Sequence, residues 1–154
     1  MFNPETKLSK HFKLKELEKS HTAQRNSIDN RVKDKIILDN LVVLCENVLE
    51  PIRTNFNIPF SPNSGYRSLE LNRLLGSKDT SQHVKGEAVD IEIPTISNRD
   101  LAEWTKRNCD FDNIILEFYD EDDPQSGWVH VSYTKSTVRR KQTLMYNGRE
   151  YKHF

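Results

Sequence analysis

The chain has 154 residues, a length typical of one domain that is large enough to bury a core. Lys and Arg together number 23, as do Asp and Glu, so the formal net charge is zero and no overall attraction to nucleic acid is expected. No stretch approaches the roughly 18 consecutive apolar residues of a membrane-spanning helix. We therefore expect one domain over residues 1–154, with no nucleic-acid partner and no membrane span.

Residues 1–7 are not followed by the apolar run of a secretory signal, so we expect synthesis in the cytoplasm without a signal peptide. Cys45 lies inside an apolar helical pattern and Cys109 at the end of another, which favours two reduced thiols. A single disulfide between them stays open at this point.

The N-terminal half predicts helices. Residues 1–26 form an N-terminal segment in which Phe12, Leu14 and Leu17 predict a short amphipathic helix that docks as a flap. A longer core helix is expected from about residue 31 to 54, capped by Asp29 or Asn30 and kinked or shortened by Pro51. Further along, the sequence predicts a short edge strand near 58–64, a helix from Ser68 to Leu75 and a helix from Ser97 to Asn108.

The C-terminal half predicts strands. Residues 113–119 and 127–133 alternate as strands and are joined by an acidic run, so we expect a hairpin with a long loop. Residues 138–154 form a second hairpin around Asn147-Gly148, the strongest short turn signal in the chain. The predicted fold class is α+β, with a small antiparallel sheet flanked by helices.

The stretch from Asp79 to Ile93 carries the first candidate metal ligands. His83 and Asp90 are seven residues apart around Gly86, and imidazole and carboxylate are both good zinc ligands. Residues 88–93 alternate as a strand, with Asp90 on the polar face. The alternative is a polar loop entering a strand whose outer face carries acidic residues, and a third ligand decides between the two.

His130 supplies that third ligand. Val129 and Val131 point to one face of their strand and His130 to the other. Two histidines and one aspartate leave a coordination position open, as catalytic zinc requires. We therefore expect a zinc site made by His83, Asp90 and His130.

Glu117 is the candidate general acid and base. If Tyr119 pairs with Trp128, antiparallel register places Glu117 directly opposite His130 on the same face. A carboxylate there can take a proton from the attacking water and pass it to a leaving amine. A slip of one residue would turn it to the other face, and a solvated strand residue is the alternative interpretation.

At this point the chain resembles the D-Ala-D-Ala carboxypeptidase-like zinc peptidases. Residues 81–90, Ser-Gln-His-Val-Lys-Gly-Glu-Ala-Val-Asp, match the family signature Ser-x-His-x-x-Gly-x-Ala-x-Asp. Trp128-Val-His130 matches the second histidine motif, and residues 64–68 resemble the arginine motif around Arg67. Residues 12–30 resemble the N-terminal stretch of short phage and bacterial members.

The resemblance implies roles for particular residues. It makes His83, Asp90 and His130 the zinc ligands. Arg67 would be catalytic, holding a substrate carbonyl or carboxylate and stabilising the oxyanion, with a surface salt bridge as the alternative. Ser81 and Gln82 would give substrate or supporting contacts.

The chain departs from the family pattern at one position. Some members carry their catalytic acid three positions before the last histidine, where this chain has Gly127. We therefore assign that role to Glu117 in preference to the loop residues Asp122 and Asp123.

The predicted function is zinc-dependent hydrolysis of peptide bonds in bacterial peptidoglycan, with a stem peptide as substrate and a monomeric enzyme. The resemblance implies an endolysin-like or D,D-carboxypeptidase-like enzyme that acts on the cell wall after phage lysis or as part of a virion. Two alternatives stay open: a zinc-containing peptidoglycan-binding module without catalysis, and a thiol hydrolase that uses Cys109.

Overall fold

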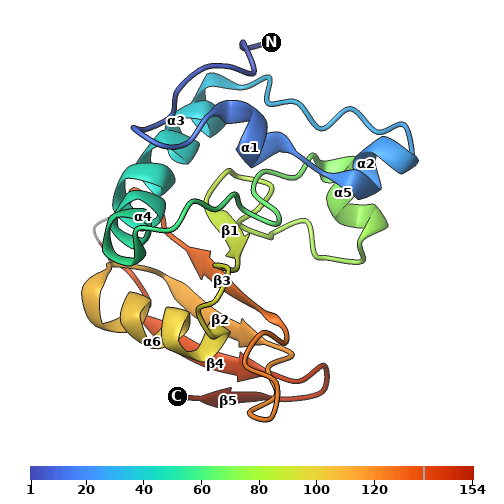
Figure 1. Ribbon diagram of the computed structural model, residues 1–154. Helices are drawn as coiled ribbons and strands as arrows, with labels where there is room; N and C mark the ends of the chain where they lie inside the picture. Colours follow the sequence, from blue (N-terminus) through green and yellow to red (C-terminus); the bar gives the residue numbers. More distant parts are fainter. Residues whose placement is uncertain (137) are drawn as a thin grey trace.

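The computed structural model describes residues 1–136 and 138–154 and has an α+β fold, which confirms the predicted class (Figure 1). Helices pack on one face of a five-stranded sheet and beside its β1 edge. The helical elements are α1 (Leu14–Glu18), α2 (His21–Arg25), α3 (Lys35–Leu44), the π-helical turn η1 (Cys45–Leu49), α4 (Glu50–Phe56), α5 (Leu69–Leu74) and α6 (Asn98–Asn108). The strands are β1 (Ala88–Ile91), β2 (Asn113–Glu117), β3 (Trp128–Ser132), β4 (Gln142–Tyr146) and β5 (Tyr151–His153).

The sheet has the order β1-β3-β2-β4-β5, and Figure 1 shows it running from β1 beside the N-terminal helices to β5 at the opposite edge. The pairs β1–β3, β2–β3 and β4–β5 are antiparallel, but β2–β4 is parallel. The sheet is therefore mixed, and the prediction of an antiparallel sheet was wrong in this respect. After β3 the chain crosses to the far side of β2, so β4 runs in the same direction as its neighbour.

One face of the sheet is covered by helices. Its alternating apolar side chains are fully buried and belong to the same core cluster as leucines and isoleucines of α3, α4 and α6. Burying each such side chain contributes about 1.5–3 kcal/mol. These strand residues are Val89, Ile91, Ile114, Leu116, Val129 and Val131. The other face carries polar and aromatic side chains together with the partly buried Ile115 and Leu144.

The long core helix begins later than predicted. It starts at Lys35, because the side chain of Asp34 caps it by accepting a hydrogen bond from the Ile36 N–H at 2.8 Å. Asn30 does not cap this helix, since its side chain bonds instead to the carbonyls of Glu18 and Tyr66 and to the N–H of Ser68. Asn30 thus links the N-terminal segment to the residues around Arg67.

The irregularity expected near Pro51 is present. The turn η1 ends at Leu49, two residues before Pro51, which has no N–H to donate to the preceding turn.

Residues 1–26 contain two short helices where one was expected, because Ser20 caps α2 by accepting from the Ala23 N–H. Phe12, Leu14 and Leu17 are at most 1% exposed and belong to the main core cluster. The segment predicted to dock as a flap is therefore a component of the core.

The remaining local predictions were confirmed for the helix caps, the C-terminal hairpin and the free cysteines, but the edge strand is shorter than predicted. Ser68 and Ser97 cap α5 and α6 as predicted. The edge strand expected near 58–64 is reduced to an isolated bridge between Ser64 and Asp90. The C-terminal hairpin forms around residues 147–148. Both cysteines are free, as favoured by the sequence.

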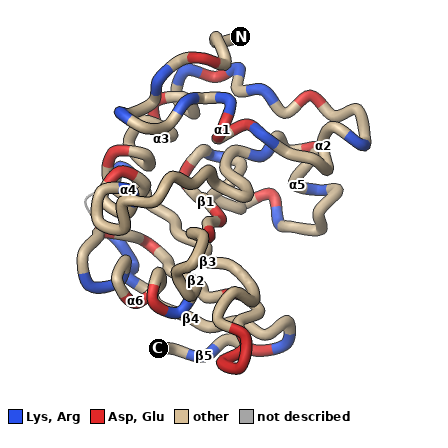
Figure 2. The backbone as a smooth tube through the Cα atoms, in the orientation of Figure 1, with Lys and Arg blue, Asp and Glu red and all other residues tan. Residues whose placement is uncertain are grey.

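Lys and Arg are scattered among Asp and Glu over much of the backbone, and acidic residues gather in the loop after β2 (Figure 2). Within residues 1–136 and 138–154, no helix has the length and hydrophobicity needed to cross a membrane.

Candidate metal centre

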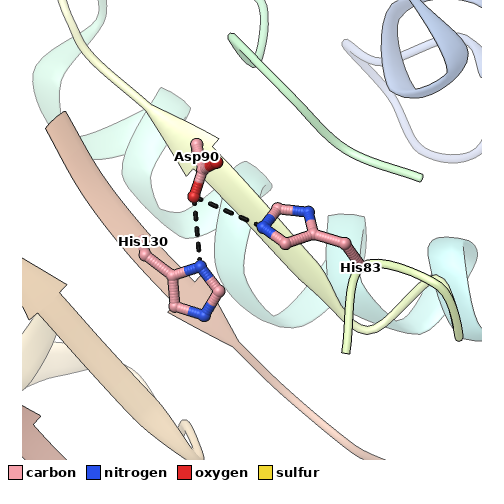
Figure 3. Close-up of side chains that lie close together, drawn as sticks. All are labelled: His83, Asp90 and His130. Carbon is pink, nitrogen blue, oxygen red and sulfur yellow. Dashed lines mark hydrogen bonds and ion pairs between the residues drawn. The ribbon is translucent and has the colours of Figure 1, made fainter. Parts of the chain in front are cut away.

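Three side chains converge at the edge of the sheet nearest the N-terminal helices (Figure 3). Asp90 lies on β1 and His130 on β3, and these two residues are direct partners in the antiparallel pair. His83 comes from the turn that leads into β1. One ligand atom from each residue lies within 4.8 Å of the other two. The structure thus brings together the three residues that the sequence predicted as zinc ligands.

Gly86 makes the turn that returns His83 toward β1. Its φ of +72° lies in the region that favours glycine, and a Cβ there would approach the Ile37 carbonyl oxygen of α3 to 2.9 Å. The turn is closed by a hydrogen bond from the Glu87 N–H to the Gln82 carbonyl at 2.9 Å. Glycine is therefore required both by the backbone angle and by the packing against α3.

The ring of His83 is oriented by the main chain. Its Nδ1 lies 2.7 Å from the Gly65 carbonyl oxygen, which accepts the N–H and leaves Nε2 as the free ring nitrogen. Gly65 itself packs against α1, because a Cβ there would lie 2.6 Å from the Leu17 carbonyl oxygen. A histidine that donates one N–H to a carbonyl presents a basic second nitrogen, as metal-binding histidines do.

The two separations from Asp90 fit a zinc ion. Nε2 of His83 lies 3.4 Å from Oδ1 of Asp90, and Nδ1 of His130 lies 3.1 Å from the same oxygen. Two ligands at about 2.0–2.1 Å from a tetrahedral zinc lie about 3.3 Å apart. Two ring nitrogens and one carboxylate oxygen are also a donor set that zinc accepts. His83, Asp90 and His130 would therefore hold the metal.

The protonation states suit metal binding. Burial lowers the pKa of His83, which keeps its imidazole neutral. Burial alone would raise the pKa of Asp90, but His83 and His130 hold it well below the usual value. Metal ligands must be deprotonated, and both groups meet this condition near neutral pH.

Arg67 lies against the carboxylate of Asp90, one of the three candidate metal ligands. Its Nη2 is 3.2 Å from Oδ2 of Asp90, and its Nε is 3.2 Å from Oγ of Ser64. The pair is largely buried, with side-chain exposures of 13% for Arg67 and 10% for Asp90. Arg67 therefore fixes one carboxylate oxygen and leaves the other facing the histidines, whereas its contact with substrate stays a prediction.

Glu117 lies on the same face as His130 but in a different register from the one predicted. Glu117 pairs with Trp128, and Ile115 lies opposite His130. The predicted pairing of Tyr119 with Trp128 was wrong by two residues. Because side chains alternate with a period of two, this slip keeps Glu117 on the face of His130, diagonal to it instead of opposite.

The reason for the slip lies at the end of β2. Phe118 has a φ of +54°, which ends the extended strand at Glu117. Gly127 has a φ of +67° and approaches so closely that a Cβ would lie 1.9 Å from the Glu117 carbonyl oxygen. The two strands therefore meet at Glu117 and Trp128, and Tyr119 lies outside the sheet.

The indole of Trp128 holds the Glu117 carboxylate. Its Nε1–H donates to Oε2 of Glu117 at 2.7 Å. Burial and the negative charge of Asp90 raise the pKa of Glu117, against smaller opposing effects of His130, Trp128 and Arg67. A carboxylate with a raised pKa, on the face of the metal ligands, can accept a proton and return it.

The acidic loop after β2 turns toward α6. Glu121 pairs with Arg99 of α6 at 3.2 Å, and the Asn98 N–H donates to the Pro124 carbonyl at 3.0 Å. The carboxylates of Asp120 and Asp123 accept hydrogen bonds from main-chain N–H groups inside the loop. Since α6 packs against the opposite face of the sheet, this arrangement favours Glu117 over the loop residues as the catalytic acid.

Ser81 and Gln82 support the turn around His83. Oγ of Ser81 accepts from the His83 N–H at 3.3 Å. The amide of Gln82 donates to Asp112 at 3.0 Å and accepts from Arg140 at 2.8 Å. These contacts tie the turn to the sheet region, and a direct contact of either residue with substrate stays a prediction.

The sequence reasoning missed three supporting groups: the Gly65 carbonyl, the Asn30 side chain and the Trp128 indole. A signal existed for Trp128 alone, because it lies two residues before His130 on one strand and so must share its face. The other two contacts join segments far apart in the chain and depend on the tertiary fold.

A family model described as peptidase M15 matches residues 10–132. The chain belongs to the peptidase M15 family. Its members are zinc-dependent, so the chain is assigned to the zinc metallopeptidases, and the resemblance noted in the sequence is confirmed. A comparison with curated proteins found no match. The match ends with β3, so the β4–β5 hairpin lies outside it.

Proposed function

We propose that this M15 peptidase hydrolyses peptide bonds in the stem peptides of bacterial cell-wall peptidoglycan. The observation that carries the proposal is the convergence of His83, Asp90 and His130 beside a carboxylate, Glu117, that shares their face of the sheet. Membership of the family supports peptidoglycan peptides as the substrate class.

A zinc ion held by the three ligands would activate water for attack and polarise the substrate carbonyl. Glu117 accepts the proton of the attacking water and then donates it to the leaving amine. The hydrogen bond from Trp128 fixes one oxygen of Glu117. Because its pKa is raised, the Glu117 carboxylate takes up a proton more readily than an ordinary exposed carboxylate does.

Arg67 supplies positive charge to the same site. It uses Nε for Ser64 and an Nη2 hydrogen for Asp90, and a guanidinium has five N–H donors. In the proposal its remaining donors bind a carbonyl or carboxylate of the substrate. Ser81 and Gln82 border the substrate in the same scheme.

The biological setting belongs to the same proposal. The enzyme would act on the cell wall as a monomer, in an endolysin-like role after phage lysis or as part of a virion, or as a D,D-carboxypeptidase. Support for the phage setting comes only from the likeness of residues 12–30 to short phage and bacterial members.

A thiol mechanism has less support. Burial raises the pKa of the Cys109 thiol to about 11, so at neutral pH the sulfur keeps its proton and is a poor nucleophile. Cys45 is fully buried in the core.

The proposal is tested by clearing of purified cell walls, followed as turbidity together with the release of free amino groups. We expect both signals from the zinc-loaded protein, their loss after chelation and their return when zinc is added. Glu117→Gln should keep zinc and lose both signals. Wild-type protein with bound zinc that binds walls but releases no amino groups would establish the binding-module alternative.

A further inference from the structure

Four aromatic side chains continue the metal-binding face beyond Glu117. The Phe118 ring lies 5.4 Å from the Trp128 ring and 5.7 Å from the Tyr146 ring, measured between centroids. Tyr146 stacks on Tyr151 with centroids 4.4 Å apart. Because Trp128 also donates to Glu117, these contacts connect the candidate catalytic carboxylate with the last strand of the sheet.

The strand register places Trp128, Tyr146 and Tyr151 on the face of the sheet that carries the candidate metal ligands. Glu117 is the direct partner of both Trp128 and Tyr146, and Tyr146 is the partner of Tyr151. Paired residues in adjacent strands point to the same side of a sheet. This side carries His130 and Asp90, whereas the helices pack on the other. The C-terminal hairpin, at the lower edge of Figure 1, thus extends the active-site face.

Phe118 is held in a conformation that is costly for a bulky residue. Its φ is +54°, and a Cβ on Gly148 in the β4–β5 turn would lie 3.0 Å from its ring. The side chain nevertheless stays 47% exposed, and Tyr151 is 57% exposed. The hairpin therefore supports an aromatic surface that is open to solvent directly beside Glu117.

We propose that Phe118, Tyr146 and Tyr151 form a subsite for an amino sugar of the peptidoglycan glycan strand, so that the enzyme prefers stem peptides still attached to sugar. This inference rests on the proposed function. Aromatic rings offer no ionic partner to the carboxylates and amines of a stem peptide. A pyranose offers an apolar face for an exposed ring and hydroxyl groups for the tyrosine O–H.

Tyr146 and Tyr151 lie on the hairpin, outside the family match, whereas Phe118 lies inside it, so the hairpin would complete the subsite as an addition to the shared catalytic framework. A preference for sugar-linked substrate is the property that this addition would give.

The test compares kcat/KM for two substrates with the same stem peptide, one attached to the N-acetylglucosamine–N-acetylmuramic acid disaccharide and one free. We expect wild-type enzyme to prefer the sugar-linked form. Tyr151→Ala should lower that preference by about three- to tenfold, mainly through KM. Tyr151→Phe should retain most of it, and Ile36→Ala, at an exposed position on α3, should leave it unchanged.

Binding of the disaccharide alone gives a second readout, followed by the intrinsic tryptophan fluorescence, to which Trp128 beside the subsite and Trp104 on α6 both contribute. A smaller response in Tyr151→Ala than in the wild type supports the subsite. Equal cleavage of both substrates by the wild type, or an equal loss on both in Tyr151→Ala, overturns the subsite and leaves the peptidase proposal standing. Cleavage of neither substrate overturns the proposed function itself.

Discussion

The two faces of the sheet are built from the same strands and serve different purposes. On the helix-covered face, side chains such as Ile114 and Val129 are fully buried and all aliphatic. On the other face, neighbouring positions carry His130, Glu117 and Trp128, which are individually oriented by hydrogen bonds or by the metal-ligand cluster. Substitutions on the first face should therefore change stability, and substitutions on the second should change chemistry.

The largest effect is expected for His130→Ala. Removal of one of three ligands should abolish stoichiometric zinc binding and lower kcat/KM by more than the about 10²–10⁴-fold that a general acid–base group contributes. Zinc content by mass spectrometry and peptide hydrolysis measure the two effects. His153→Ala is the matched control, because His153 is exposed on β5 of the same sheet and should keep both properties.

Glu117→Gln should lower kcat by about 10²–10⁴-fold while zinc content stays at one ion per chain. The amide retains an oxygen that can accept from Trp128, so the fold should be preserved. Asp122→Asn in the acidic loop is the control, and we expect less than about a twofold change, as for other surface substitutions. A larger loss in Asp122→Asn than in Glu117→Gln would move the catalytic role to the loop.

Ile114→Ala tests the helix-covered face. Loss of a fully buried side chain should lower the free energy of unfolding by about 2–5 kcal/mol, measured by denaturant titration. At a temperature where the variant is folded, its zinc content and kcat should match the wild type. Ile115→Ala, one residue along the same strand and only half-buried, should cost less stability. If Ile115→Ala lowered the free energy of unfolding more than Ile114→Ala, the distinction between the two faces would be wrong.

The smallest effect is expected for Trp128→Phe, which keeps a ring and removes the N–H bound to Glu117. We expect about a tenfold loss of kcat/KM, because a hydrogen bond to a charged group contributes about 1.5–3 kcal/mol and water partly replaces it.

The same variant predicts a pH shift. Burial and Asp90 already raise the pKa of Glu117, so wild-type activity should fall on the acid side at a pH above the ordinary glutamate value, where the base becomes protonated. The Trp128 hydrogen bond opposes that rise, and its loss should move the acidic limb further upward. If the acidic limb of the kcat/KM profile moved to lower pH in Trp128→Phe, the assignment of Glu117 as the base would be contradicted.

The sequence was sufficient for features that depend on local pattern. Alternation identified the strands and their faces, Ser68 and Ser97 identified helix starts, and the spacing around Gly86 identified two candidate metal ligands. Each of these signals comes from residues close together in the chain. The candidate zinc ligands could be predicted because each of the three lies in a local pattern of its own, and the fold brings them together.

Features that depend on tertiary packing were not predictable from the sequence. The strand register slipped because Phe118 adopts a left-handed backbone conformation that is rare for its type. The core helix began late because Asn30 bonds to three distant main-chain groups, which leaves Asp34 as the cap. The parallel pairing of β2 with β4 depends on a crossover that no local turn signal specifies.

The most direct test of the account is mass spectrometry of the peptides released from purified peptidoglycan by the zinc-loaded wild-type protein. We predict soluble fragments that each carry a new amino terminus and the mass of one added water, and the position of that terminus identifies the bond. The same fragments should be absent with Glu117→Gln and with the chelated wild type. Zinc-loaded wild-type protein that yields no new amino terminus, or Glu117→Gln that yields the same fragments at the same rate, would contradict it.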